Sequence, residues 1–162
     1  VEELLDFSRM QSGRMVLKNE KMDILAELDE TVFAFKDRAM REGIELIYNA
    51  PNLPAPMSGD PDRIKQVFVN ILDNALKYTK QGQISIYMED KSLVIEDSGI
   101  GIPAEDLPRI FEKGFTGYNG RENKKSTGIG LYLCKNIMDK LQWNITADSE
   151  VGSGTKIYLT KM

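Results

Sequence analysis

Apolar residues recur at helical spacing in three long segments of the chain, which cover residues 24–42, 60–79 and 128–141. In each segment the apolar side chains fall on one stripe and polar side chains fill the rest, which is typical of an amphipathic helix that packs on a core. Asp60 followed by Pro61 marks a helix start, because aspartate caps the first turn and proline suits the first helical position. The pattern therefore predicts three amphipathic helices.

Segments in which apolar and polar residues alternate separate these helices and predict strands. A tight link at Asp90-Lys91 predicts a hairpin, and a glycine-rich turn at 152–154 joins the last two strands. Prolines predict a loop at 50–59, and a short helix is expected at 103–113. The expected strands are residues 16–22, 44–49, 83–89, 92–96, 144–148 and 156–160. This order predicts an α/β (α+β) two-layer sandwich, with one mixed, mostly antiparallel sheet and helices on one face.

The first residues differ from the rest of the chain. Residues 1–13 show a loose helical pattern that ends at a serine-glycine pair, where a helix can stop. Because this pattern begins without a capping residue, we expect it to be the C-terminal end of a longer helix. The length of 162 residues fits one domain, so residues 14–162 are expected to form a single core.

Composition narrows the chemistry that the chain can perform alone. The 162 residues include no histidine and one cysteine, so serine-histidine hydrolysis, imidazole-ligated zinc and an internal disulfide are excluded within the chain. A net charge of −4 argues against a protein that coats nucleic acid, and no apolar run is long enough to cross a membrane. The cysteine use suits a reducing compartment. Cys134 lies on the apolar stripe of the last helix and is expected to be a packing residue.

Three polar residues share the face of the 60–79 helix that points away from its apolar stripe. Asn70 and Asn74 are four residues apart, about 40° around the helix, and Lys77 lies about 20° from Asn70. Carboxamide oxygens can complete the coordination of a magnesium ion that already carries a polyphosphate, and a lysine ammonium can neutralise a phosphate oxygen. The same residues are also ordinary on an exposed helix face, so the spacing alone leaves both interpretations open.

Two glycine motifs add candidate chemistry. Asp97 ends a predicted strand and is followed by Gly99 and Gly101, which allow close approach of the backbone. A partly buried carboxylate only accepts hydrogen bonds, so it suits the exocyclic amine of adenine better than the carbonyl of guanine, although a simple turn capped by aspartate is the alternative. Residues 126–131 open the last helix, where backbone N–H groups could bind an anion or only cap the helix. Neither motif has the spacing of a P-loop or of GxGxxG.

Taken in order, four motifs resemble the N, G1, F and G2 boxes of sensor histidine kinases. They are residues 70–79 (NILDNALKYT), 97–102 (DSGIGI), 111–115 (FEKGF) and 127–131 (TGIGL). The resemblance covers residues 60–160, and residues 3–10 resemble the end of the family's second dimerisation helix. It implies the Bergerat ATP-binding fold, with the C-terminal stub of the dimerisation helix and a linker at residues 1–13 and the catalytic ATP-binding domain at residues 14–162.

The resemblance also implies roles for individual residues. Asn70 and Asn74 correspond to residues that hold Mg²⁺, and Lys77 to one that meets phosphate. Asp97 corresponds to the residue that receives the adenine amine, and Lys113 to a basic residue that reaches the terminal phosphates. Asn70, Lys77 and Lys113 are therefore the expected catalytic residues. The further expected contacts to ATP are Tyr78, which would pack at the nucleoside, Gly99, Gly101, Ile102, Phe115, Thr127, Gly128, Ile129, Gly130 and Leu131.

Asn70 separates the chemistries that this fold supports. ATPases and serine-directed kinases of the superfamily typically carry a glutamate at this position, where it activates water or a hydroxyl. A carboxamide cannot act as a base, which favours transfer to an imidazole over hydrolysis. Because the chain contains no histidine, the resemblance implies a donor domain whose acceptor is a histidine on a dimerisation domain. A nucleotide-dependent binding module without phosphotransfer is the alternative.

The resemblance further implies how the domain is used in the cell. It identifies residues 117–127 as a lid that closes over the nucleotide. It implies a cytoplasmic domain of a parent protein that is anchored in the bacterial cell membrane and passes phosphate to the receiver domain of a response regulator. The parent is expected to be a homodimer and this fragment a monomer, and no nucleic-acid partner is expected.

Overall fold

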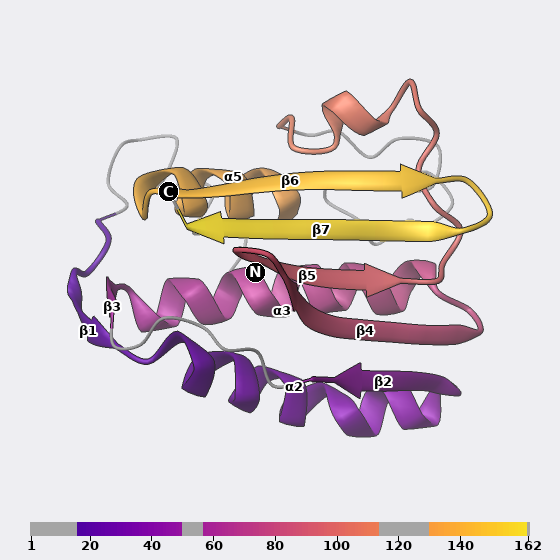
Figure 1. Cartoon of the computed structure of the whole chain (residues 1–162), viewed down its shortest axis with the longest axis horizontal. Coiled ribbons are helices and arrows are strands. Elements are labelled where there is room, and N and C mark those ends of the chain that lie inside the picture. The colour runs from indigo at the N-terminus through magenta and orange to yellow at the C-terminus, as the bar shows by residue number, and fades with distance from the viewer. Residues whose placement is uncertain (1–15, 50–56, 114–129, 162) are drawn as a thin grey trace.

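The computed structural model describes residues 16–49, 57–113 and 130–161 (Figure 1). All three predicted amphipathic helices are present, and the predicted helix at residues 1–13 lies outside the described residues. None of the described helices is long and apolar enough to cross a membrane. In chain order the elements are β1 (Glu20–Met22), α2 (Ile24–Arg41), β2 (Ile44–Tyr48), β3 (Met57–Gly59), α3 (Pro61–Tyr78), β4 (Gly82–Glu89), β5 (Ser92–Asp97), η1 (Leu107–Arg109), α5 (Gly130–Lys140), β6 (Trp143–Glu150) and β7 (Gly154–Lys161).

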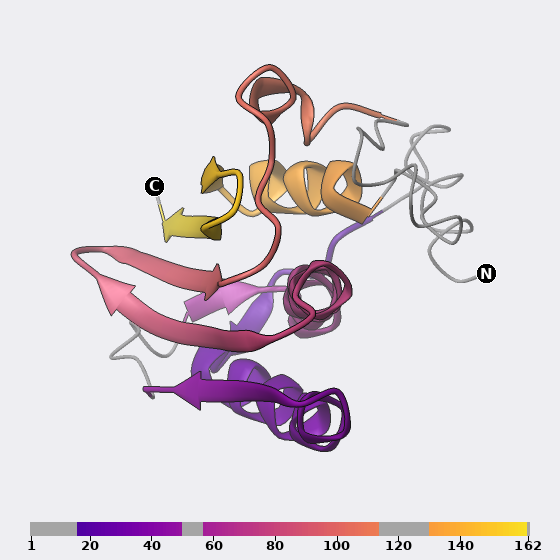
Figure 2. The same cartoon turned by 90° about the vertical axis from the view of Figure 1, so that its right-hand side faces the viewer.

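Five strands form the main sheet in the order β2-β4-β5-β7-β6. β2 and β4 are parallel because the chain crosses over through α3 between them, and the other neighbours are antiparallel. The predicted hairpin at Asp90-Lys91 joins β4 to β5, with Glu89 opposite Ser92. Seen along the sheet, α2, α3 and α5 lie on one side of it (Figure 2). The predicted two-layer sandwich with a mixed, mostly antiparallel sheet is therefore confirmed.

A second sheet of two strands shows that the expectation of a single sheet is wrong. β1 pairs antiparallel with β3, with Glu20 opposite Gly59. β3 lies in the segment 50–59 that was predicted to be loop, and β1 is shorter than the predicted strand 16–22. A strand of three residues carries too little alternation to be recognised, and three prolines in 50–59 hide it further. Because β1 leads into α2 and β3 into α3, this ribbon ties the starts of the two helices together.

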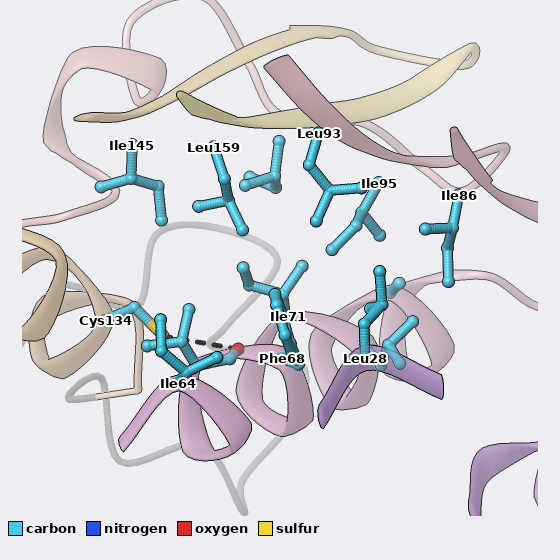
Figure 3. Close-up of a cluster of buried hydrophobic side chains, with 14 of the residues drawn as sticks. Leu28, Ile64, Phe68, Ile71, Ile86, Leu93, Ile95, Cys134, Ile145 and Leu159 are labelled. Carbon is cyan, nitrogen blue, oxygen red and sulfur yellow. Dashed lines mark hydrogen bonds between the residues drawn. The ribbon is translucent and has the colours of Figure 1, made fainter. Parts of the chain in front are cut away.

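One core lies between the helices and the inner face of the main sheet (Figure 3). Phe68 of α3 faces Leu93 and Ile95 of β5 across this layer, and all three side chains are buried. Burial of side chains of this size stabilises the fold by roughly 1.5–3 kcal/mol each. Cys134 of α5 is fully buried in the same core, and its thiol donates to the Val67 carbonyl oxygen at 3.9 Å. The predicted packing role of this cysteine is confirmed.

The segment 103–113 does not form the predicted short helix. It consists of turns around η1, a 3-10 turn of three residues. Pro108 has no N–H to donate, and its ring disfavours helical geometry in the residue before it. The N–H groups of Asp106 and Leu107 both donate to the Pro103 carbonyl oxygen, at 2.9 and 3.1 Å, which closes a single turn. Pro108 therefore interrupts the segment and prevents a longer helix.

Asp60 fixes the start of α3, as the sequence predicts. Its side chain is buried, and Oδ1 accepts a hydrogen bond from the Arg63 N–H at 3.2 Å. Oδ2 accepts from the Lys18 N–H at 2.9 Å, so the same carboxylate holds the segment that precedes β1. Pro61 follows at the first helical position. One side chain thus determines where α3 begins and which segment lies beside that end.

Replacing Asp60 with alanine should lower the free energy of unfolding by about 1–3 kcal/mol, because two backbone N–H groups lose their acceptor. Asp60→Asn keeps one side-chain oxygen that can accept, so its loss should be smaller. Urea unfolding followed by circular dichroism measures both variants. If Asp60→Ala unfolds at the same urea concentration as the wild type, the role of Asp60 as a cap is contradicted.

Candidate functional site

The C-terminal half of α3 presents three polar side chains on one face, as their spacing predicts. Asn70 and Asn74 are half-buried, and the Lys77 side chain is 24% exposed. These side chains are therefore more enclosed than those of an ordinary exposed helix face. The Nδ2 of Asn70 is buried and has no hydrogen-bond partner among the described residues. A buried amide without a partner is uncommon in folded proteins, and this one is available to a ligand or to ordered water.

The donor atoms on α3 fit a hard divalent cation. Asn70 and Asn74 carry carboxamide oxygens, and magnesium prefers oxygen ligands. Residues 16–49, 57–113 and 130–161 contain no cluster of three or more histidine, cysteine, aspartate or glutamate side chains that could hold a metal ion. Two neutral oxygens alone are a weak site. A cation held there would have to bring further ligands with it, as magnesium does when it is bound to a polyphosphate.

Asp97 is the last residue of β5, and its carboxyl group is largely enclosed. Oδ1 accepts hydrogen bonds from the N–H groups of Gly99 at 2.9 Å and Thr155 at 3.3 Å. Burial raises the pKa of the Asp97 carboxyl to about 6; the two N–H groups lower it, and the charge of Glu96 raises it. In the described part of the chain no hydrogen bond reaches Oδ2. This oxygen is therefore an acceptor that is open to a ligand.

Glycines allow the loop after β5 to lie directly against the end of α3. A side chain on Gly99 would begin 2.3 Å from the Tyr78 carbonyl oxygen, and the Ile100 N–H donates to that oxygen at 3.1 Å. Gly101 has a φ of 77°, and a side chain there would begin 2.2 Å from the Glu150 carbonyl oxygen. Only glycine fits both positions. The loop therefore brings together the end of α3, the end of β5 and the turn between β6 and β7.

Thr79 belongs to the same junction, although the sequence motifs assign it no role. It directly follows α3, is 3% exposed, and its Oγ1 has no hydrogen-bond partner among the described residues. Thr79 Oγ1 and Asp97 Oδ1 both lie 2.9 Å from the position that a Cβ on Gly99 would take. A buried hydroxyl of this kind commonly binds ordered water or a ligand atom. Thr79 is the last residue of the motif 70–79, but the sequence gives it no role because its proximity to Asp97 exists only in the fold.

The remaining expected contacts are placed only in part. Tyr78 is the last residue of α3, and Ile102 follows the glycine loop; both are half-buried. Lys113 is exposed in a turn after η1, and Gly130 and Leu131 are the first residues of α5. The other expected contacts and the lid lie outside the described residues, namely Phe115, Thr127, Gly128, Ile129 and residues 117–127.

Comparison with known proteins identifies similar chains. Residues 59–161 match the family model described as histidine kinase-, DNA gyrase B-, and HSP90-like ATPase. The chain is 28% identical over 165 residues to sensor histidine kinase RcsC of Salmonella typhimurium, which covers 98% of this chain and 17% of that protein. It is 32% identical over 171 residues to hybrid signal transduction histidine kinase B of Dictyostelium discoideum, which covers 99% of this chain and 9% of that protein. The chain therefore spans less than a fifth of the length of these relatives.

Solved structures share the architecture. Full-length ShkA in complex with AMPPNP gives a TM-score of 0.81 at 22% identity, over 98% of this chain and 34% of that one. Histidine kinase AdeS of Acinetobacter baumannii gives 0.69 at 26% identity, over 99% and 76% of the two chains. The catalytic domain of histidine kinase ThkA gives 0.73 at 24% identity, over 88% and 97%. The fold described above is thus also found in histidine kinases.

Asp97→Asn should stabilise the chain at neutral pH. The folded pKa of about 6 lies above the ordinary value of 3.8, so the folded protein binds the proton more tightly than the unfolded chain does. The cost of keeping the carboxylate ionised is therefore absent below about pH 4, grows as pH rises, and is complete above about pH 6. A shift of this size corresponds to at most about 3 kcal/mol. Asparagine keeps an oxygen for the two N–H groups and carries no charge.

Thermal melting between about pH 4 and pH 8 measures this difference. We expect Asp97→Asn to melt near the wild type at the acidic end and several degrees above it at pH 7.5. Asp148→Asn is the matched control, because Asp148 is an exposed residue of β6 and its replacement removes the same negative charge. A stability difference for Asp97→Asn that does not vary with pH would contradict the burial of an ionised group.

Proposed function

The chain belongs to the histidine kinase-, DNA gyrase B-, and HSP90-like ATPase family, and from this premise we propose that it binds magnesium ATP and transfers the γ-phosphoryl group to a histidine on a separate domain. One observation carries the proposal. A helix that bears two carboxamides and an ammonium ends against the loop that follows an enclosed carboxylate with an open oxygen. Base recognition and phosphate binding can then occur side by side. The names of the relatives, which are histidine kinases, support histidine as the acceptor.

Adenine is the base that Asp97 selects. The open Oδ2 accepts a hydrogen bond from the exocyclic amine, while Oδ1 stays fixed by the N–H groups of Gly99 and Thr155. Guanine would place a carbonyl oxygen against the carboxylate and leave both acceptors without a donor, which costs binding free energy. The Thr79 hydroxyl lies on the same side and can hold a water molecule between the protein and the base.

The polar face of α3 receives the phosphates. Asn70 and Asn74 would hold magnesium through carboxamide oxygens, which add no negative charge next to the phosphates. Magnesium, when bound, neutralises part of the phosphate charge and orients the terminal phosphate. Lys77 contributes a positive charge on the same face, and its limited exposure strengthens that interaction relative to bulk water. Lys113 is proposed to reach the terminal phosphates from the turn after η1.

Transfer to an imidazole needs no base at position 70. A bond forms between phosphorus and an imidazole nitrogen, which attacks with its own lone pair, while the bond from phosphorus to the oxygen of ADP breaks. The residues of the site therefore act by positioning and by neutralising charge, which is how most phosphoryl transfer is catalysed. A water molecule or a hydroxyl would have to lose a proton, and the carboxamide of Asn70 cannot take it.

The acceptor lies outside this chain, because the chain has no histidine. We assign it to the dimerisation domain of a homodimeric sensor kinase, with the receiver domain of a response regulator as the next recipient of the phosphoryl group. The domain is assigned to the cytoplasmic part of a membrane-anchored parent. A single cysteine suits the reducing compartment in which ATP is available.

Phosphotransfer is tested by mixing the chain with γ-labelled ATP, magnesium and a histidine-bearing dimerisation domain from a related kinase. We expect label on the dimerisation domain that is lost in acid and survives in base, as a phosphorus-nitrogen bond does. Replacing the acceptor histidine with glutamine should remove the label. Asn74→Asp should reduce it by about tenfold or more, because a carboxylate would face the phosphates.

Two outcomes would overturn phosphotransfer. Binding of ATP with no label on any matching dimerisation domain would support a nucleotide-dependent binding module instead. Release of inorganic phosphate without label on the partner would support hydrolysis, which Asn70 disfavours.

Adenine recognition through Asp97 predicts a pH dependence of binding. The affinity for ADP should be constant above about pH 7 and should fall below about pH 6, where the carboxylate takes up a proton. At pH 7.5, Asp97→Asn should weaken ADP binding by about tenfold or more, because the asparagine amide can face the adenine amine donor to donor. Calorimetric titration measures both effects. Wild-type affinity in Asp97→Asn would contradict the adenine assignment.

A further inference from the structure

An ion cluster joins α2 to the phosphate-facing side of α3. Arg38 Nη1 lies 2.7 Å from Asp73 Oδ1 and donates a hydrogen bond to it, and Lys77 Nζ lies 3.7 Å from Asp73 Oδ2. The side chains of Arg38, Asp73 and Lys77 are 34%, 38% and 24% exposed, so water screens them only in part. Asp73 directly precedes Asn74, and Lys77 is one turn further along the helix. One carboxylate therefore lies between two cations beside the candidate phosphate site.

The two cations hold Asp73 unequally. Arg38 makes a short hydrogen bond, and this bond with Asp73 is the main cause that raises the pKa of Arg38. Lys77 is beyond hydrogen-bond distance and keeps only an ion pair. An acid four residues before a lysine is nevertheless the favoured arrangement for pairing along a helix. If Arg38 were absent, the Asp73 carboxylate would have Lys77 as its nearest positive charge among the described residues.

Further contacts fix the Arg38 side chain in this position. Its Nε donates to Glu42 Oε2 at 2.8 Å, and its guanidinium lies 5.9 Å from the centre of the Phe35 ring. These partners belong to α2 and the residue that ends it, so they hold the guanidinium independently of α3. A planar donor group held in this way can satisfy Asp73 without a large loss of side-chain freedom. The Arg38 guanidinium is therefore held in a position where it pairs with the Asp73 carboxylate.

We propose that Arg38 is a positioning residue for nucleotide binding, which occupies Asp73 and so leaves the Lys77 ammonium available to a phosphate oxygen. The inference rests on the proposed function, because the partner that Lys77 gains is the phosphate. Loss of Arg38 weakens nucleotide binding in two ways. Lys77 is drawn to Asp73, and the uncompensated Asp73 carboxylate repels the phosphates. Both effects require the negative charge at residue 73, so its removal cancels them.

A purely structural role for Arg38 makes a different prediction. A clamp between α2 and α3 would lower stability when it is removed, and Asp73→Asn would not repair the damage, because the clamp would be missing in both variants. The electrostatic role predicts instead that Asp73→Asn restores nucleotide affinity in the Arg38 variant. The two roles are therefore separated by whether Asp73→Asn restores or fails to restore nucleotide affinity when Arg38 is also replaced.

The test compares four variants of the 162-residue chain, Arg38→Met, Arg38→Lys, Asp73→Asn and the double variant Arg38→Met/Asp73→Asn, by calorimetric titration with magnesium ATP and with adenosine. Arg41→Met is the matched control, since Arg41 lies on the same helix, is exposed and makes no ion pair among the described residues. Melting temperatures of all variants report on stability separately.

Arg38→Met should weaken ATP binding by about two- to fivefold at low salt, the range expected for a partly exposed ion pair, and should leave adenosine binding unchanged. Arg38→Lys, which keeps a positive charge near Asp73, should lose less. The double variant should return to within about twofold of wild type, and the effect should shrink at high salt.

Two results would overturn the inference alone: an ATP affinity of Arg38→Met equal to that of Arg41→Met, or a double variant as weak as Arg38→Met. Failure of the wild type to bind ATP would overturn the proposed function together with the inference. An Arg38→Met chain that binds adenosine normally is folded, so its ATP affinity decides between these outcomes.

Discussion

The contact between the Ile100 N–H and the Tyr78 carbonyl oxygen, made at 3.1 Å over the bare Cα of Gly99, fixes the relation between the two halves of the candidate site. The last carbonyl groups of a helix have no partner within the helix, and here the loop after β5 supplies one. Asp60 holds the other end of α3, and the apolar stripe of the helix lies in the core. The polar face of α3 therefore has a single orientation relative to Asp97, and a side chain at Gly99 would force the two apart.

Among the described residues, polar groups without partners lie along the polar face of α3 and at its contact with the loop after β5. Asn70 Nδ2 and Thr79 Oγ1 are buried without partners in the described part of the chain, and Asp97 is enclosed with one oxygen unused. Each of these groups lowers stability, since a buried donor or acceptor loses its bonds to water. The surrounding structure tolerates the loss because α3 is packed on the core and β5 lies in the middle of the sheet, between β4 and β7. Unsatisfied groups held on a packed helix and at the end of a central strand are preorganised for a ligand that satisfies them.

Local signals in the sequence were sufficient for the three long helices and the hairpin, because a cap such as Asp60 or a turn such as Asp90-Lys91 acts within a few residues. They predicted β1 with bounds that were too long, but missed β3 and the pairing that joins Glu20 to Gly59 across α2 and a proline-rich segment. The same limit applies to the site. Motifs located Asp97 and the α3 face, but they gave Thr79 no role and did not include Arg38, because Arg38 meets Asp73 from 35 residues away on another helix. Contacts of that range exist only in the folded chain.

The proposed site has a negative charge where the base binds and neutral or positive groups where the phosphates bind. A carboxylate is useful at the base, where Asp97 faces an amine, and harmful at the phosphates, where it would add to the substrate's negative charge. The phosphate end accordingly carries Asn70, Asn74 and Lys77, and the one acid among them, Asp73, is covered by a guanidinium from α2. A glutamate at position 70 would supply a base for hydrolysis and would also break this division. Because position 70 holds asparagine, the phosphate end has neither a general base nor an added negative charge there. It can therefore only position a phosphoryl group for a nucleophile that arrives from elsewhere.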